Sequence, residues 1–276
     1  MTDMTPRQLP DVPTTDYRLQ IGRHFLTRWE HLGGHAGIVF TCEPREEGVL
    51  LVLTGRVTVN VTNGAETVTR TLGERGDVFS GLPYALVMAP GDQASVRPET
   101  DAAEVVFAHT GVPEAHTTRS AIVTPAEVRV HQVGEASYKR TVREVVGETQ
   151  GATTRLCCGE TLQDPGMWSS WPHHEFDRRP DLATQFDEIF YVFAKPLVPS
   201  IEPGEVILRR RGLMVDGSAV DDVLALRNGQ EARVPLGHHP IAAPLDSRLC
   251  YVWFYAGPPE LKKRYAKRAK DNGYYA

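Results

Sequence analysis

Apolar residues in the first half of the chain follow the two-residue period of a β-strand. Val49–Leu53 is an apolar run, and Val57, Val59 and Val61 then alternate with polar residues. Alternation of this kind is typical of a half-buried strand. Asn63-Gly64 follows, a pair that favours a type I′ hairpin turn. The pattern therefore predicts two antiparallel strands joined at that turn.

Further short strands, punctuated by glycine and proline, are predicted along the rest of the chain. They cover residues 67–72, 76–79, 86–88, 105–107, 128–130, 141–143, 153–161, 186–193, 206–208, 223–226, 232–235 and 249–255. Many short strands at close spacing favour an all-β sandwich or barrel. Only 258–270 predicts a helix, because proline stands at its start and Lys and Arg gather near its end.

The two halves of the chain share one plan, and a polar stretch over 113–124 separates them. Each half has an apolar strand, an Asn-Gly hairpin signal (Asn63-Gly64 and Asn228-Gly229) and a closing apolar strand. This weak internal repeat predicts two β-barrels in tandem. We expect an N-terminal tail over 1–20, a first barrel over 21–124, a second barrel over 125–257 and a C-terminal helix or tail over 258–276.

Composition narrows the classes of partner and compartment. The 276 residues carry a net charge of −5, and 41% are apolar, as in ordinary globular proteins. No basic patch dominates, so we expect no nucleic acid partner. Neither a signal peptide nor a membrane-spanning run of about 20 apolar residues is found, so we expect a cytoplasmic protein. The four cysteines lack CxxC spacing, which predicts free thiols.

Two histidine pairs, His173-His174 and His238-His239, stand beside proline and glycine turns in a chain with ten histidines. First-row metals favour imidazole and carboxylate ligands that converge from different strands and leave one position open. His174, Glu188 and His239 could form such a set. Spacing alone leaves a second interpretation open, in which each pair is a surface turn.

The spacing of Gly229, Pro235, Gly237 and His239 resembles the second cupin motif, a hairpin that delivers a metal-binding histidine. The likeness extends over most of the chain, from Gly48 to Pro258. Its carriers are Leu53–Val59, Gly76–Phe79, Met167–Pro172, Asp187–Tyr191, Val234–Pro240 and Ala256–Pro258. Together they resemble the 5-deoxy-glucuronate isomerase family of bacterial inositol catabolism, to which uronate ketol-isomerases of pectin breakdown are related.

The resemblance implies a bicupin, with two jelly-roll barrels and one divalent metal (Zn, Mn or Fe) in the second barrel only. The family's ligands are three histidines and a glutamate, and His174, Glu188 and His239 match three of them. The fourth position falls on Phe176, which has no donor atom. His173 could replace it only if the strand shifts by one residue. Because of this departure, the alternative that the pocket binds no metal stays open.

The implied reaction is the aldose–ketose isomerisation of a deoxy or keto uronic acid, in which the metal acts as a Lewis acid. A positioned base is also needed. The candidate catalytic residues are Glu188, Tyr191 and Tyr251. The candidate substrate-binding residues are Arg140, Arg143, Trp171 and His238, the arginines because guanidinium suits a carboxylate. Trp253 stands where the family has asparagine, which changes a wall of the pocket.

Two other classes of function stay open: a cupin dioxygenase, which two histidines and a glutamate would also suit, and a sugar-binding relative without metal. Bound metal would separate the last class from the others, and oxygen uptake would separate the dioxygenase from the isomerase. In each case the expected partner is a small sugar acid, without nucleic acid or membrane, and we expect a homo-oligomer.

Overall fold

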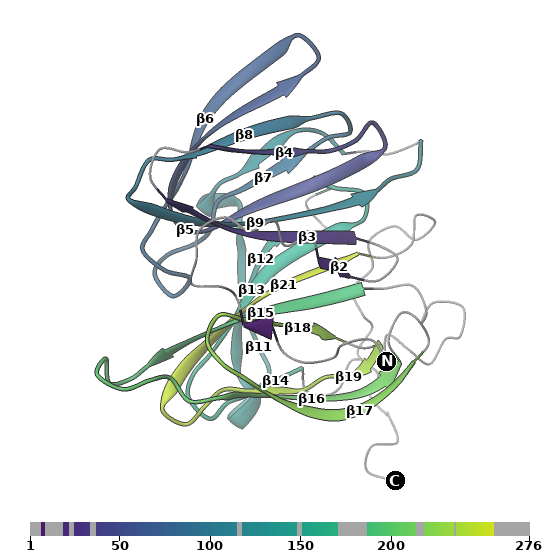
Figure 1. The fold of residues 1–276 in the computed structure, drawn as a ribbon. Coiled ribbons are helices and arrows are strands. Elements are labelled where there is room, and N and C mark those ends of the chain that lie inside the picture. The colour runs from purple at the N-terminus through teal and green to yellow at the C-terminus, as the bar shows by residue number, and fades with distance from the viewer. Residues whose placement is uncertain are drawn as a thin grey trace.

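The computed structural model describes residues 7–8, 19–21, 25–33, 37–114, 118–147, 151–170, 187–213, 218–234 and 236–256. Within these ranges the regular structure is strand, apart from the 3₁₀ helices η1 (Pro125–Glu127) and η2 (Ala136–Tyr138). The strands form two barrels, one above the other in Figure 1. The expected all-β architecture of two tandem barrels is confirmed, whereas the helix expected over 258–270 lies outside the described residues.

The first barrel is built from a nine-stranded sheet in which β5 is central. Its strands are β2 (Leu19–Ile21), β3 (Phe25–Gly33), β4 (Ile38–Thr41), β5 (Glu46–Asn63), β6 (Glu66–Arg75), β7 (Ala85–Met88), β8 (Gln93–Pro98), β9 (Ala102–Gly111) and β10 (Ala121–Val123). The first part of β5 pairs with β7 and β9, and its second part pairs with β6 and β8. The strand shifts register near Gly55, whose φ of +75° suits glycine. One long strand thus serves both sides of the barrel.

The second barrel is built from a seven-stranded and a five-stranded sheet. Its strands are β1 (Arg7–Gln8), β11 (Arg129–Val133), β12 (Arg140–Val146), β13 (Leu156–Gln163), β14 (Trp168–Ser169), β15 (Asp187–Pro196), β16 (Val206–Leu213), β17 (Ala219–Leu226), β18 (Gln230–Val234), β19 (Leu236–His238), β20 (Ile241–Ala242) and β21 (Ser247–Ala256). In the larger sheet β15 lies between β18 and β21. Residues of the expected N-terminal tail, Arg7–Gln8, pair with β18 and so belong to this sheet.

Two local predictions were wrong. Asn63-Gly64 does join the paired strands β5 and β6, but Asn228-Gly229 does not close a hairpin. There the chain passes from β17, which pairs with β16, to β18, which pairs with β15 in the other sheet. Residues 76–79 form a turn in place of a strand, because the Asp77 carboxylate accepts a hydrogen bond from the backbone N–H of Phe79.

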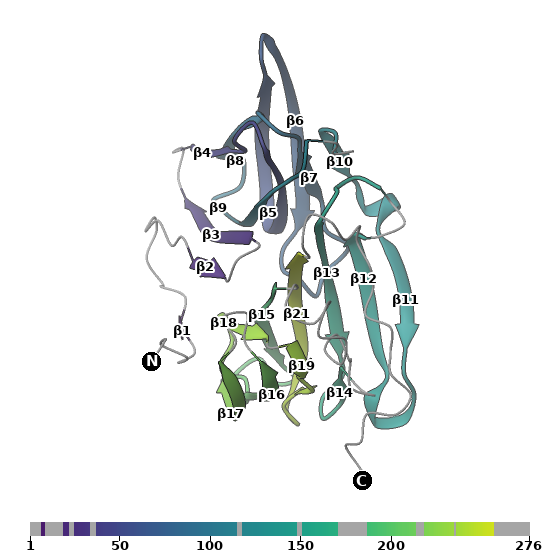
Figure 2. The same cartoon turned by 90° about the vertical axis from the view of Figure 1, so that its right-hand side faces the viewer.

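Apolar side chains gather in three places: inside the first barrel, inside the second barrel, and between the two. In β5, Leu50 and Val52 face the first interior, while Val49, Leu51 and Leu53 face the second barrel. Strand β21 shows the same division, with alternate residues in the second interior and in the contact between barrels. Both strands are therefore buried on both faces, which explains their nearly continuous apolar sequences. Figure 2 shows the two barrels from the side.

Candidate active site

Glu188 and His239 meet inside the second barrel. Glu188 is the second residue of β15 and lies on the same face as Phe190 and Val192, whose side chains fill the interior. His239 lies between β19 and β20, directly before Pro240, and its ring is 5.9 Å from that of Phe190. His239 Nε2 is 3.7 Å from Glu188 Oε2. The structure thus brings together two of the three residues expected to bind metal.

The pair lies in a poorly hydrated environment. Only 2% of the His239 side chain and 16% of the Glu188 side chain are exposed. Burial raises the pKa of Glu188 from 4.5 to about 8, because a carboxylate loses hydration when it leaves water. A bound cation would compensate for that loss. The Glu188 carboxyl group is therefore suited to bind a cation and to release its proton when it does so.

The donor atoms of this pair fit a divalent metal. Imidazole nitrogen and carboxylate oxygen together suit Zn, Fe or Mn. Two ligands that lie about 2.0–2.2 Å from one ion are about 3–3.5 Å apart, so the observed 3.7 Å needs only a small adjustment. His173, His174 and Phe176 lie outside the described residues. The described ranges alone contain no group of three or more His, Cys, Asp or Glu that could hold a metal.

Aromatic side chains form the wall beside the pair. Tyr255 on β21 is the direct cross-strand neighbour of Glu188, and Trp253 is the neighbour of Phe190 one step deeper. The Trp253 and Tyr255 rings stack at 5.8 Å. Sequence reasoning did not select Tyr255, although its spacing of two from Trp253 already placed both on one face of the predicted strand.

Trp253 occupies space that a glycine leaves open. Gly159 on β13 is the register partner of Trp253, and a Cβ atom there would lie 2.3 Å from Trp253 Cζ2. The indole therefore lies across the Gly159 backbone. The expectation that Trp253 forms part of the pocket wall agrees with this position in the barrel interior.

Tyr251 lies deeper in the barrel than the Glu188–His239 pair. Its cross-strand partner is Val192, four residues beyond Glu188, or about 13 Å along the strand. The Phe190 ring lies 4.6 Å from the Tyr251 ring and also contacts His239. Burial raises the pKa of Tyr251, although the Arg140 charge and the Ser169 hydrogen bond lower it. This placement does not favour Tyr251 as the base.

Tyr191 and Arg143 face away from the second interior. Tyr191 donates a hydrogen bond of 2.7 Å to Thr27 Oγ1 of the first barrel. Arg143 donates to Glu160 and to the Val78 carbonyl, each at 3.0 Å. Both residues therefore belong to the contact between barrels. For Tyr191 the strand period already indicates this, because residues three apart on a strand lie on opposite faces.

The remaining candidates lie elsewhere. Arg140 is the first residue of β12, two residues before Val142, which is the cross-strand partner of Thr161. Its guanidinium donates to the Tyr138 carbonyl. It is thus nearer to Tyr251 than to Glu188. His238 ends β19 opposite Arg211. Trp171 lies outside the described residues.

Comparison with known proteins identifies the lineage of these barrels. A family model described as the KduI/IolB family matches residues 18–273. The chain belongs to this family. The crystal structure of an IolB-like protein from Salmonella typhimurium LT2 has a similar fold. That structure superposes with a TM-score of 0.73 at 22% identity over 88% of each chain. AerE from Microcystis aeruginosa gives a TM-score of 0.58 at 10% identity over 92% of this chain and 98% of its own.

Two curated relatives of this KduI/IolB chain carry the name 5-deoxy-glucuronate isomerase. The one from Geobacillus kaustophilus is 28% identical over 215 residues, which cover 77% of this chain and 72% of the relative. The one from Bacillus subtilis strain 168 is 25% identical over 237 residues, which cover 86% and 83% respectively. The resemblance inferred from the motifs is confirmed, and the fold is a bicupin. Among the described residues, no helix is long and apolar enough to cross a membrane.

Proposed function

We propose that this protein is a metal-dependent aldose–ketose isomerase that acts on a deoxy or keto uronic acid, with 5-deoxy-glucuronate as the first substrate to test. The observation that carries the proposal is the meeting of Glu188 and His239 inside the second barrel of a KduI/IolB-family chain. The names of the curated relatives support the choice of reaction and substrate.

Glu188 and His239 would hold the metal, with His174 as the third ligand that the family resemblance implies. When bound, the metal would supply Lewis acidity at the substrate carbonyl. Zn, Mn or Fe would suit this donor set. The apolar walls of Phe190 and Trp253 exclude water, which strengthens electrostatic interactions within the site.

Isomerisation also requires a group that moves a proton between adjacent carbons. Of the three buried tyrosines considered, Tyr255 is the one beside Glu188, since Tyr191 faces the first barrel and Tyr251 lies behind Phe190. We therefore assign Tyr255 to the substrate-facing wall, where its hydroxyl can hold a substrate oxygen or pass a proton.

The decisive experiment measures metal and turnover on the same protein samples. Elemental analysis should find a divalent metal, and NMR should follow the conversion of 5-deoxy-glucuronate, with solvent deuterium appearing on the carbon that receives the proton. His239→Ala should lose both metal and turnover. His109→Ala, on β9 of the first barrel, is the matched control and should keep both.

Other outcomes point to the other classes. Oxygen uptake with a sugar acid would favour a dioxygenase. If the wild-type protein binds no metal and converts no uronate, the isomerase proposal is contradicted, and the interpretation as a sugar-binding relative is favoured. Turnover that survives His239→Ala would show that the site lies elsewhere.

A further inference from the structure

Strand β6 leaves one edge of the first barrel open. The strand spans Glu66–Arg75 and, among the residues that the structure describes, pairs with β5 alone. Figure 1 shows the β5–β6 hairpin at the top of the first barrel, away from the second barrel. The N–H and C=O groups along such an edge are a template for pairing with another strand. The edge of β6 is therefore able to extend the sheet into another chain.

The hairpin determines which backbone groups of β6 face outward. Glu66 directly follows the two-residue loop, so its backbone groups bond to β5. Because bonded and non-bonded positions alternate along an antiparallel ladder, Val68 and Arg70 also bond to β5. The backbone groups of Thr67 and Thr69 then point away from β5. In agreement, the Thr69 carbonyl accepts a hydrogen bond of 2.8 Å from Nη1 of the Arg70 side chain.

Side-chain hydrogen bonds hold this part of the hairpin in register. The Thr62 and Thr67 hydroxyl groups are 3.0 Å apart, and Thr69 Oγ1 donates to Asn60 Oδ1 at 2.7 Å. The edge of β6 is thus ordered before another strand binds to it, which lowers the entropy cost of pairing.

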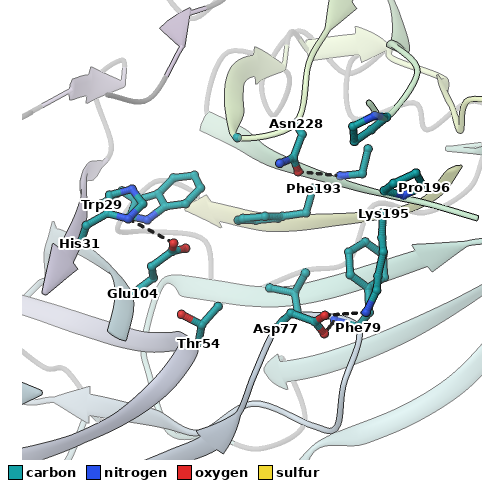
Figure 3. A pocket seen from close by; sticks show the side chains of 14 residues that line it. Trp29, His31, Thr54, Asp77, Phe79, Glu104, Phe193, Lys195, Pro196 and Asn228 are labelled. Carbon is teal, nitrogen blue, oxygen red and sulfur yellow. Dashed lines mark hydrogen bonds and ion pairs between the residues drawn. The ribbon is translucent and has the colours of Figure 1, made fainter. Parts of the chain in front are cut away.

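Glu66, Val68 and Arg70 form an exposed row on one face of β6. Val68 is 42% exposed. Neither Glu66 nor Arg70 forms an ion pair within the described ranges. The charges at the pocket between the barrels differ in this respect, since Lys195 Nζ lies 2.7 Å from Asp77 Oδ2 (Figure 3). The charges on β6 are thus available to a second molecule.

We propose that β6 pairs antiparallel with β6 of a second copy of this chain, about a two-fold axis at Val68. The two Val68 side chains lie opposite each other. Thr67 exchanges backbone hydrogen bonds with the partner's Thr69, and Glu66 lies opposite the partner's Arg70. Each contact occurs twice, as the symmetry of a two-fold dimer requires. The first barrels of the two copies then share one continuous sheet.

Charge favours this register over its neighbours. An axis at Glu66 or at Arg70 would set like charges opposite each other, which destabilises a strand pair. An axis at Thr69 would set Glu66 opposite Leu72, which is buried in the barrel core. The axis at Val68 joins Glu66 to Arg70 in non-hydrogen-bonded pairs, where opposing side chains approach most closely. Arg70 uses Nη1 toward the Thr69 carbonyl and has further N–H donors for a carboxylate.

The size of the contact sets the expected affinity. One short strand from each copy gives an interface at the low end of the usual range. We therefore expect a dissociation constant of roughly 1–100 μM. The proposal does not depend on the isomerase activity, because Glu188 and His239 lie in the second barrel.

Charge reversal tests the register by sedimentation equilibrium of the full chain. Glu66→Arg and Arg70→Glu each set like charges opposite each other and should weaken the dimer by about tenfold or more. The double variant, and an equal mixture of the two single variants, restore opposite charges and should dimerise again. Glu202→Arg and Arg119→Glu, at exposed residues outside β6, are the matched controls and should dimerise as the wild type does.

Hydrogen exchange tests the backbone pairing without any substitution. The Thr67 and Thr69 amides should exchange rapidly in dilute protein and become protected as its concentration rises, whereas the Val68 and Arg70 amides should be protected throughout. Four results would each overturn the proposal: a wild type that is monomeric at about 500 μM, a dimer that Arg70→Glu leaves intact, a monomeric double variant, or a Thr69 amide that gains no protection.

Discussion

Arg75 of the first barrel and Glu160 of the second form a buried two-point ion pair. Arg75 Nη2 is 2.5 Å from Glu160 Oε1, and Nη1 is 3.1 Å from Oε2. At most 2% of either side chain is exposed. Arg143 adds a second guanidinium to the same carboxylate. Arg75 also donates to the backbone carbonyls of Leu53 and Val52, which fixes its direction.

Replacing Glu160 should destabilise the whole protein. Glu160→Gln leaves two buried guanidinium groups without their anion, and removal of one partner of a buried ion pair costs about 3–5 kcal/mol. Chemical denaturation measures the free energy of unfolding. Glu205→Gln, which removes an exposed pair with Arg227, is the control and should cost less than about 1 kcal/mol. Equal effects of the two substitutions would contradict the role assigned to Glu160.

Tyr255 and Tyr191 should differ in the property that each substitution changes. Tyr255→Phe should lower kcat by about tenfold or more, as expected for loss of a group that handles a substrate proton. Tyr191→Phe should leave kcat unchanged and reduce stability by about 1 kcal/mol, because it removes the hydrogen bond to Thr27. Steady-state kinetics and denaturation of both variants check this. A kinetic defect in Tyr191→Phe alone would reverse the assignment.

Removing the Trp253 indole should leave a void above Gly159. Trp253→Ala is expected to cost about 3–5 kcal/mol, as large-to-small changes in cores do. Trp168→Ala, at a tryptophan that is 41% exposed, should cost much less. Thermal unfolding measures both. Recovery of stability in Trp253→Phe would support packing as the cause.

The contribution of the Asp77–Lys195 pair to the stability of the folded protein should depend on pH. Partial burial acts to raise the Asp77 pKa, but hydrogen bonds from Lys195 and Ser80 outweigh it and hold the pKa below 3.8. Because the folded-state pKa is lowered, the stabilisation is present above pH 3.8 and is lost as pH falls through the folded-state value. Lys195→Gln should therefore reduce stability at pH 7 by up to about 1 kcal/mol, and much less near pH 2. Denaturation at both pH values measures the difference.

Phe176→His should raise metal affinity. The substitution places an imidazole where the 5-deoxy-glucuronate isomerase family has its fourth metal ligand. Each added ligand raises the affinity of a site for its metal. Competition with a chromophoric chelator measures the affinity. His173→Ala is the companion variant: loss of metal there would show that His173 already replaces the missing ligand, and Phe176→His would then give little gain.

The strand period in the sequence accounts for much of the fold. Alternating and continuous apolar runs predicted β5 and β21, because burial on one or both faces leaves a direct record in the sequence. The point at which the chain passes from one sheet to the other cannot be read from the apolar pattern. Asn228-Gly229 has the residues of a hairpin turn, yet β18 pairs with β15, since long-range pairing depends on the packing of the entire second barrel.

The site was predictable in part for the same reason. Glu188 and His239 belong to motifs whose spacing carries the resemblance, and they meet. Arg143, expected to bind substrate, pairs with Glu160 in the structure, since guanidinium groups suit ion pairs between barrels as well as substrate carboxylates. Only the three-dimensional partner, here Glu160, distinguishes the two uses.

The apolar layer between the barrels has a consequence for any attempt to separate them. Val49, Leu51 and Leu53 on one side and Val252 and Phe254 on the other are fully covered only while both barrels are present. Either half, produced alone, would expose to solvent a sheet face of large aliphatic and aromatic side chains. Exposed apolar patches of this kind promote aggregation. We therefore expect the two barrels to unfold together and neither half to be recovered as a stable monomer.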